Sequence, residues 1–191
     1  MPHSVLRSRA PIYATAAVLI ALAAGLTTVA LVGSAQRRDD RAAYLRYERA
    51  IMPSLREGGR IVVQQMRPSI PDLSEGKIGR REALERAAGW TGALQRIRAD
   101  VAVLDPPSFL GDVERRWIGA LDAYLQIPSV FERAAAAQGA ERTALLDRAV
   151  TTGNRADELF DRAASVMQSH RRRLGLGPSL DLPDPVAAKP S

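Results

Sequence analysis

The sequence predicts an all-α protein in which an N-terminal transmembrane helix is followed by an antiparallel, up-down-up-down four-helix bundle. Near the N-terminus there is a long uncharged stretch, and after it apolar residues recur at steps of three and four. Hydrophobic residues make up 46% of the chain and aromatic residues only 5%. The core must therefore consist mainly of Ala, Leu, Val and Ile, a composition that favours helices where β-branched and aromatic runs are missing.

The same observations divide the chain into four parts. We predict a basic N-terminal segment at residues 1–11 and a transmembrane helix at residues 12–35. A helical bundle domain follows at residues 36–175, and a proline-rich tail, expected to be disordered, at residues 176–191.

The predicted membrane span contains no charged residue between positions 12 and 35. A helix needs about 20 apolar residues to cross a hydrocarbon core of ~30 Å. A cleaved signal peptide is the alternative, because Gly33, Ser34 and Ala35 offer small residues at a cleavage site. The apolar run, however, exceeds the ~7–15 residues usual for the core of a signal peptide. We therefore expect an uncleaved signal anchor in the cell membrane, with membrane lipid as its partner.

The orientation of this span is less constrained by charge. Arg7 and Arg9 precede it, whereas Arg37, Arg38 and Arg41 follow it. The positive-inside rule leaves both orientations open, but long C-terminal domains translocate with little regard to nearby charge. We expect the bundle to be extracytoplasmic.

The bundle is predicted from four stretches in which apolar side chains repeat at steps of three or four. Such spacing places these side chains on one face of a helix. The stretches are residues 44–66, 83–104, 110–134 and 145–166. The first is the weakest, because Pro53 and the pair Gly58 and Gly59 interrupt it. We expect the Trp, Tyr and Phe residues of these stretches to pack in the core.

Helix-breaking residues predict where the four helices are connected. Pro68 and Pro71 with residues 74–76 are expected to join the first two helices. Residues 105–108 end the second helix, and Ser108 is expected to cap the third. Residues 138–139 end the third helix, and residues 171–175 have the arginines and the glycine typical of a helix C-terminus. Short connections of this kind imply antiparallel neighbours.

The chain lacks the residues that several kinds of catalytic and metal-binding site require. The absence of cysteine removes disulfides, thiol nucleophiles and zinc–thiolate sites. The chain has 2 histidines, His3 and His170, whereas a di-iron carboxylate bundle needs a Glu-x-x-His motif on each of two helices. No metalloprotease, serine-hydrolase, P-loop or Rossmann motif occurs. We therefore expect no enzyme, no cofactor and no metal site.

The charges are also arranged in a way that is typical of a solvated helix surface. The net charge is +6, but acidic and basic residues are interspersed, which argues against nucleic-acid binding. Pairs at helical i,i+4 spacing contribute about 0.2–0.5 kcal/mol each. The predicted pairs are Glu82 with Arg86, Asp112 with Arg116, and Glu158 with Arg162.

Helix breakers inside three of the four predicted helices form the first candidate site. With a rise of ~1.5 Å per residue, Gly58, Gly59, Pro128 and Gly153 fall at similar heights in an alternating bundle, and Trp90 of the second helix falls near them. Our hypothesis is that this layer forms a hinge or a small ligand pocket. The alternative is that the breakers coincide by chance.

A basic cluster forms the second candidate site. His170, Arg171, Arg172 and Arg173 stand at the end of the last helix, and Arg37 and Arg38 follow the span. If the last helix returns toward the bilayer, these residues contact anionic lipid headgroups. The alternative is that they complement the negative end of the helix dipole and are solvated.

The overall plan resembles that of single-pass proteins of bacterial envelopes that carry a helical bundle outside the membrane. This resemblance is one of architecture only, and a shared architecture does not establish a shared function. We expect a non-enzymatic envelope interaction or accessory protein with an unknown protein partner. The alternative is a sensory bundle that binds a small ligand and acts through a partner.

Overall fold

A computed structural model describes the backbone of residues 10–177 and the side chains of residues 35–177. The chain divides into two compact units, residues 1–42 and residues 43–191. Every regular element of the described residues is a helix, and no strand occurs among them. The prediction of an all-α protein is confirmed.

The N-terminal unit contains the first part of helix α1 (Ala10–Ile61). Near the end of this unit, Gln36 Nε2 donates a hydrogen bond to Asp40 Oδ1 at 3.1 Å. The predicted span at residues 12–35 lies outside the residues whose side chains are described, apart from Ala35. In the part of the chain that the structure describes with its side chains, no helix has both the length and the apolar character that crossing a membrane requires.

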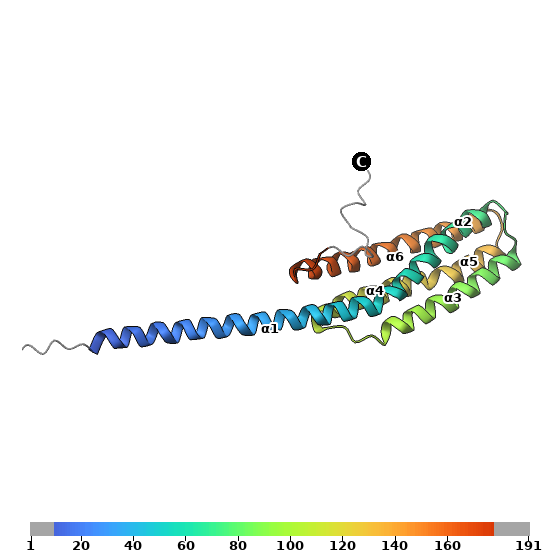
Figure 1. Ribbon diagram of the computed structural model, residues 1–191. Coiled ribbons are helices and arrows are strands. Elements are labelled where there is room, and N and C mark those ends of the chain that lie inside the picture. Colours follow the sequence, from blue (N-terminus) through green and yellow to red (C-terminus); the bar gives the residue numbers. More distant parts are fainter. Residues whose placement is uncertain (1–9, 178–191) are drawn as a thin grey trace, which may run out of the picture. The chain divides into compact units, whose positions relative to one another are not determined.

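The second unit contains four helical arms, and successive arms run in opposite directions (Figure 1). The first arm consists of the end of α1, a π-helical turn η1 (Val62–Met66) and helix α2 (Arg67–Ser74). The second is α3 (Arg80–Ala102). The third consists of a 3-10 turn η2 (Ser108–Leu110), α4 (Gly111–Tyr124) and α5 (Gln126–Ala136). The fourth is α6 (Gly139–Arg173).

The first arm is longer than the sequence predicts, because the helix continues through two prolines. Pro68 and Pro71 lie inside α2 and not in the connection, which begins only after Ser74. In an α-helix a proline loses one hydrogen bond and clashes with the carbonyl four residues earlier. Here the backbone N–H of Arg67, the residue before Pro68, bonds to Val62 O and closes a wider π turn.

The third arm is two helices where the sequence predicts one. Pro128 has no N–H to donate to the carbonyl of Tyr124, four residues earlier, and α4 ends at Tyr124 while α5 begins at Gln126. The start of this arm also differs from the prediction. Ser108 makes no capping hydrogen bond to α4 and belongs to η2, which leads into the helix at Gly111.

The core of the second unit lies between the four arms and contains most of the aromatic side chains. Trp117, Tyr44 and Phe131 are fully buried. Small residues of α3 and α6 are equally buried, among them Ala87 and Ala156. The prediction that the aromatic residues pack in the core is confirmed for these positions.

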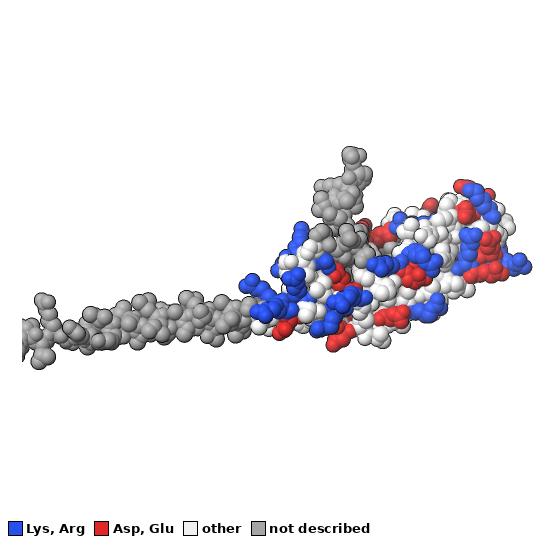
Figure 2. Space-filling view, in the orientation of Figure 1, with Lys and Arg blue, Asp and Glu red and all other residues white. Residues whose placement is uncertain are grey.

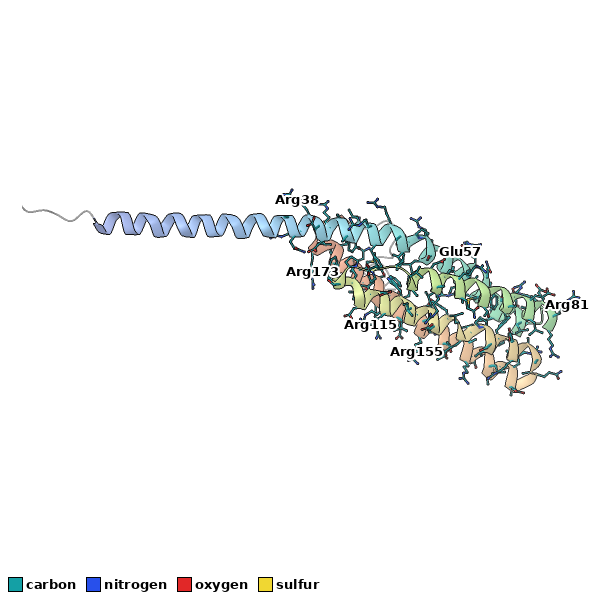
Figure 3. The ribbon with its side chains drawn as sticks, turned by 90° about the horizontal axis from the view of Figure 1, so that it is seen from below. Arg38, Glu57, Arg81, Arg115, Arg155 and Arg173 are labelled. Atoms are coloured by element: carbon teal, nitrogen blue, oxygen red, sulfur yellow. The ribbon has the colours of Figure 1, made fainter. Side chains whose placement is uncertain are left out.

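Most charged side chains of this unit project outward. Figure 3 shows Arg81, Arg115 and Arg155 pointing away from the helices. On the face seen in Figure 2, acidic and basic side chains are interspersed over the second unit.

Candidate functional site

Three of the five residues predicted to form a hinge or pocket line two adjoining cavities. Gly58 and Gly59 line a cavity of about 150 Å³, and Gly153 lines a second cavity of about 220 Å³. Trp90 and Pro128 line neither. Trp90 packs against an aromatic ring of α5 with the ring centroids 5.0 Å apart, and Pro128 is buried within α5. The structure thus brings the glycines to one region and places Trp90 and Pro128 elsewhere in the core.

The two cavities share four lining residues, namely Val62, Arg67, Tyr124 and Asp157. We call the two cavities together the Arg67 groove. Its walls come from all four arms of the bundle, and most of its lining side chains are apolar. The groove therefore depends on tertiary packing and not on any one helix.

A cluster of three polar side chains lies where the two cavities meet. Arg67 Nη2 donates a hydrogen bond to Asp157 Oδ2 at 2.5 Å. The Tyr124 hydroxyl donates to Asp157 Oδ1. The side chains of Arg67 and Asp157 are 56% and 31% exposed, so this ion pair faces solvent while Tyr124 beside it is buried.

The environment keeps the Tyr124 hydroxyl protonated. Burial raises its pKa above the ordinary value, and the hydrogen bond to Asp157 and the charge of that carboxylate raise the pKa further. The nearby Arg67 guanidinium acts in the opposite direction but does not outweigh them. Tyr124 therefore remains a hydrogen-bond donor at neutral pH and holds one oxygen of Asp157.

The backbone beside the groove departs from regular α-helix. The π turn η1 contributes Val62 to the groove, and single π turns inside α-helices occur frequently at functional sites. Two helical glycines precede this turn, and a helical glycine costs about 1 kcal/mol relative to alanine. A Cβ at Gly58 would come no closer than 3.9 Å to Ile97, and a Cβ at Gly59 would meet no atom within 4 Å. Close packing therefore does not require either glycine.

Trp117, beside the first cavity, has a buried donor without a partner among the described residues. Its side chain is 0% exposed, and its Nε1 has no hydrogen-bond partner among the described residues. The indole packs against Phe160 with ring centroids 4.4 Å apart, and both rings line the cavity. A buried donor without a partner costs about 1–3 kcal/mol, so Trp117 is the second feature of the groove that lowers stability.

Arg171, predicted as a headgroup contact, is engaged within the bundle. It forms a salt bridge with Glu48, and the two side chains are only 15% and 10% exposed. Arg171 Nε also donates to the carbonyl oxygen of Gly177. Tyr44 lies beside this pair and donates to the carbonyl oxygen of Met167 at 3.2 Å. These contacts give Arg171 a structural role in joining the first and fourth arms.

The other members of the predicted basic cluster are more exposed to solvent than Arg171. His170 lies against an aromatic ring of η2 at a centroid distance of 5.5 Å. Burial and the charge of Arg173 lower the pKa of His170. Arg172 and Arg173 are exposed in the last turn of α6. Arg37 and Arg38 are exposed on the N-terminal unit.

Two of the three predicted helical ion pairs are confirmed. These are Glu82 with Arg86 at 2.6 Å and Glu158 with Arg162 at 3.3 Å. The third prediction is wrong, because Asp112 binds Arg115 and not Arg116. The Nε atom of Arg116 is buried and has no hydrogen-bond partner among the described residues, and the residue as a whole is half-buried.

The described residues contain no group of three or more His, Cys, Asp or Glu side chains that are close enough to hold a metal ion. In the Arg67 groove, both carboxylate oxygens of Asp157 already accept hydrogen bonds. The Trp117 indole N–H is buried, so the donors that remain open to the groove are the further N–H groups of Arg67, whose side chain is 56% exposed. This set of groups suits the binding of a hydrogen-bond acceptor.

Comparisons with protein-family models, with curated protein sequences and with solved structures each found no match to this chain.

Proposed function

We propose that this chain is a non-enzymatic protein held in the cell membrane by one N-terminal helix, with its antiparallel bundle as an extracytoplasmic interaction domain. An interaction or accessory role in a bacterial envelope fits this plan, with membrane lipid as one partner and a protein as the other. The observation that carries the proposal is the uncharged run at residues 12–35, which has the length of a membrane-spanning helix.

The proposal is tested by extraction of membranes at alkaline pH, which releases peripheral proteins and leaves spanning ones in the pellet. The full-length chain should remain in the pellet, with the mass of the uncleaved sequence. Replacing Leu22 and Leu26 by Arg should release it, because each Arg near the centre of a span costs about 2.5–3.5 kcal/mol. The matched control is replacement of the same two residues by Val. An intact wild-type chain in the soluble fraction would contradict the proposal.

The orientation can be tested in the same cells, because the natural chain has no cysteine. Val103 lies in the second unit and is 81% exposed, so Val103→Cys provides a single labelling site. A membrane-impermeant maleimide should label this variant in intact spheroplasts if the bundle is extracytoplasmic. Labelling that appears only after lysis would show the opposite orientation.

A second candidate function is a sensory bundle that binds a small ligand and acts through a partner. The Arg67 groove favours it, because the groove combines apolar walls with a partly exposed ion pair of Arg67 and Asp157. A ligand that binds only the folded state raises the melting temperature. A thermal-shift screen of small molecules on the full-length chain tests this candidate, and a screen without stabilisation would favour the interaction protein.

A further inference from the structure

We propose that the groove between the first and fourth arms binds residues 178–191 of the chain's own C-terminal tail, in an extended form. These residues lie outside the described part of the chain. The inference goes beyond both candidate functions and does not depend on the membrane anchor. It assigns an occupant to the groove from the row of cavities, from the place where the described chain leaves the bundle, and from the order of charges along the groove and the tail.

A third cavity extends the Arg67 groove. It measures about 220 Å³ and shares Ile70, Pro71 and Val150 with the second cavity. The three cavities, which we call the extended groove, follow one another between the first and fourth arms, where α2 and α6 lie side by side (Figure 1). Val63 in the first cavity and Val150 in the third are 57% and 43% exposed. Apolar surface that stays exposed in a groove indicates a binding site.

The last described residues lead the chain toward the extended groove. After α6, Gly175 has a φ of 66° and reverses the backbone, and the Leu176 N–H bonds to Arg171 O at 3.0 Å. Leu176 is buried, and the Gly177 carbonyl accepts a hydrogen bond from Arg171 Nε. Arg171 also pairs with Glu48, so Gly177 lies beside the ion pair that joins the first and fourth arms. The tail therefore starts beside the two arms that form the groove.

The length of the tail matches the length of the extended groove. Proline favours an extended chain that rises ~3.1 Å per residue. The tail contains Pro178, Pro183, Pro185 and Pro190. Such a chain covers ~31 Å from Gly177 to Ala187, and α6 covers the same ~31 Å from Arg171 back to Val150. Because the prolines restrict the unbound tail, its binding loses less conformational entropy than that of another segment of equal length.

The apolar residues of the tail fall at the cavities when the tail and α6 are measured from these starting points. Leu182 lies ~16 Å along the tail, and Phe160 of the first cavity lies ~16 Å along α6. Val186 lies ~28 Å along the tail, and Gly153 of the second cavity lies ~27 Å along α6. Each of these two cavities is thus matched by one aliphatic side chain of the tail.

The charges of the tail meet opposite charges in the same register. Asp184 lies ~22 Å along the tail, at the height of the pair of Arg67 and Asp157, ~21 Å along α6. Among the described residues, the Arg67 guanidinium bonds to Asp157 through Nη2, and its side chain is 56% exposed. Its other N–H groups can therefore hold a second carboxylate. Lys189, ~37 Å along the tail, falls at Asp147, an exposed acid of the third cavity ~36 Å along α6.

The test uses disulfide crosslinking, because the natural chain has no cysteine. The groove pair, Val150→Cys with Ala187→Cys, places one thiol in the groove and one on the tail at the same height. The control pair combines Ala187→Cys with Arg155→Cys. Arg155 is nearer to Gly177 along α6 but points away from the helices (Figure 3), so a tail outside the groove would reach it at least as often as Val150.

The two pairs are compared in full-length chains that are reconstituted in lipid nanodiscs and treated with a mild oxidant. The groove pair should form its intramolecular disulfide at least about tenfold faster than the control pair, because docking raises the local concentration of the tail thiol. Equal rates would overturn the proposal. Disulfides between two chains, seen as a dimer on a non-reducing gel, would assign the groove to the tail of a second copy and would also overturn it.

A reversal of charge tests the register. In the groove pair, Lys189→Glu should slow crosslinking about two- to fivefold, because it places a like charge at Asp147. Asp147→Lys alone should have a similar effect, and the two reversals together should restore the original rate. Asp147 is exposed, so its replacement leaves the core of the bundle intact. A double variant as slow as the single ones would contradict the register on which the proposal rests.

A substitution in the tail tests the apolar contact. Leu182→Ser should slow crosslinking of the groove pair at least about fivefold, since a small polar side chain gains little from burial in the first cavity. Leu182→Met keeps the volume and the apolar character and should leave the rate within about twofold. Circular dichroism should show that both variants keep their helices. An unchanged rate in Leu182→Ser would overturn the proposal.

Discussion

The second unit contains two clusters of the same composition, each made of an arginine, a carboxylate and a tyrosine. At one end of the bundle, Arg171 and Glu48 lie beside Tyr44, and both charged side chains are at most 15% exposed. In the Arg67 groove, Arg67 and Asp157 lie beside Tyr124, and the charged side chains are 56% and 31% exposed.

The surroundings distinguish the two clusters more than the side chains do. The pair of Arg171 and Glu48 joins the first and fourth arms where both side chains are buried. Removing one partner there leaves an uncompensated buried charge, which lowers the stability of the folded state. The pair of Arg67 and Asp157 joins the same two arms beside open cavities, a π turn and two glycines. We infer that the first cluster specifies how the helices pack and that the second leaves part of the bundle open for binding.

The largest effect is expected at the buried cluster. Arg171→Ala leaves the Glu48 carboxylate buried without its cation, which should lower the free energy of unfolding by about 3–5 kcal/mol. Urea unfolding of the full-length chain in nanodiscs, followed by circular dichroism, measures this loss. The double variant Glu48→Gln with Arg171→Met removes both charges and should recover most of it. A loss below 1 kcal/mol in Arg171→Ala would show that the pair is not structural.

A smaller effect is expected at the groove. Asp157→Ala removes a partly exposed ion pair, worth about 0–1 kcal/mol, and the hydrogen bond from Tyr124. The expected loss of about 1–2 kcal/mol is therefore well below that of Arg171→Ala. The same urea titration compares the two variants, and equal losses would remove the distinction between the clusters.

Gly59→Ala should change stability in the opposite direction. A methyl group at this position meets no atom within 4 Å, and alanine is favoured over glycine in a helix by about 1 kcal/mol. The melting temperature should rise by a few degrees, since about 1 kcal/mol corresponds to ~2–8 °C for domains of this size range. Gly89→Ala is the control for helix propensity away from the groove. A fall in the melting temperature of Gly59→Ala would show that the glycine is required by the packing.

The last prediction concerns alkaline pH. Burial raises the pKa of both Tyr44 and Tyr124 above the ordinary value near 10. The folded state thus resists loss of these protons, so the stabilisation is complete below pH ~10 and is lost as the pH rises through the folded pKa. Unfolding free energies at pH 9 and pH 11 should show this fall, and Tyr44→Phe and Tyr124→Phe should each reduce it. A stability that is independent of pH in this window would contradict the raised pKa values.

The sequence predicted the arms of the bundle from the spacing of apolar residues, because that spacing decides which face of a helix is buried. The steps of three and four between Trp90, Leu94, Ile97 and Val101 predict one face of a helix, and these four residues are buried in α3. The C-terminus of α6 was also predicted, since arginines in the last turn and Gly175, with a φ of 66°, are local signals.

Features that depend on more than one arm could not be predicted. The partners Arg67 and Asp157 are 90 positions apart, and Glu48 and Arg171 are 123 apart. No local pattern pairs such residues. The sequence points to the glycines of the groove because glycine breaks a helix, whereas Trp90 and Pro128 share with them only a similar height estimated from the helical rise. Pro68 and Pro71 predict a connection, whereas the helix continues through both of them after a π turn.

Hydrogen–deuterium exchange of the full-length chain in nanodiscs tests the contrast between the two clusters most directly, because amides beside open cavities exchange through local opening of low free energy. Our account predicts faster exchange of backbone amides in the segments that line the groove, residues 54–67, 117–124 and 153–160, than in the helical turns around Glu48 and Arg171. Equal protection at the two clusters, or greater protection in the groove segments, would contradict it.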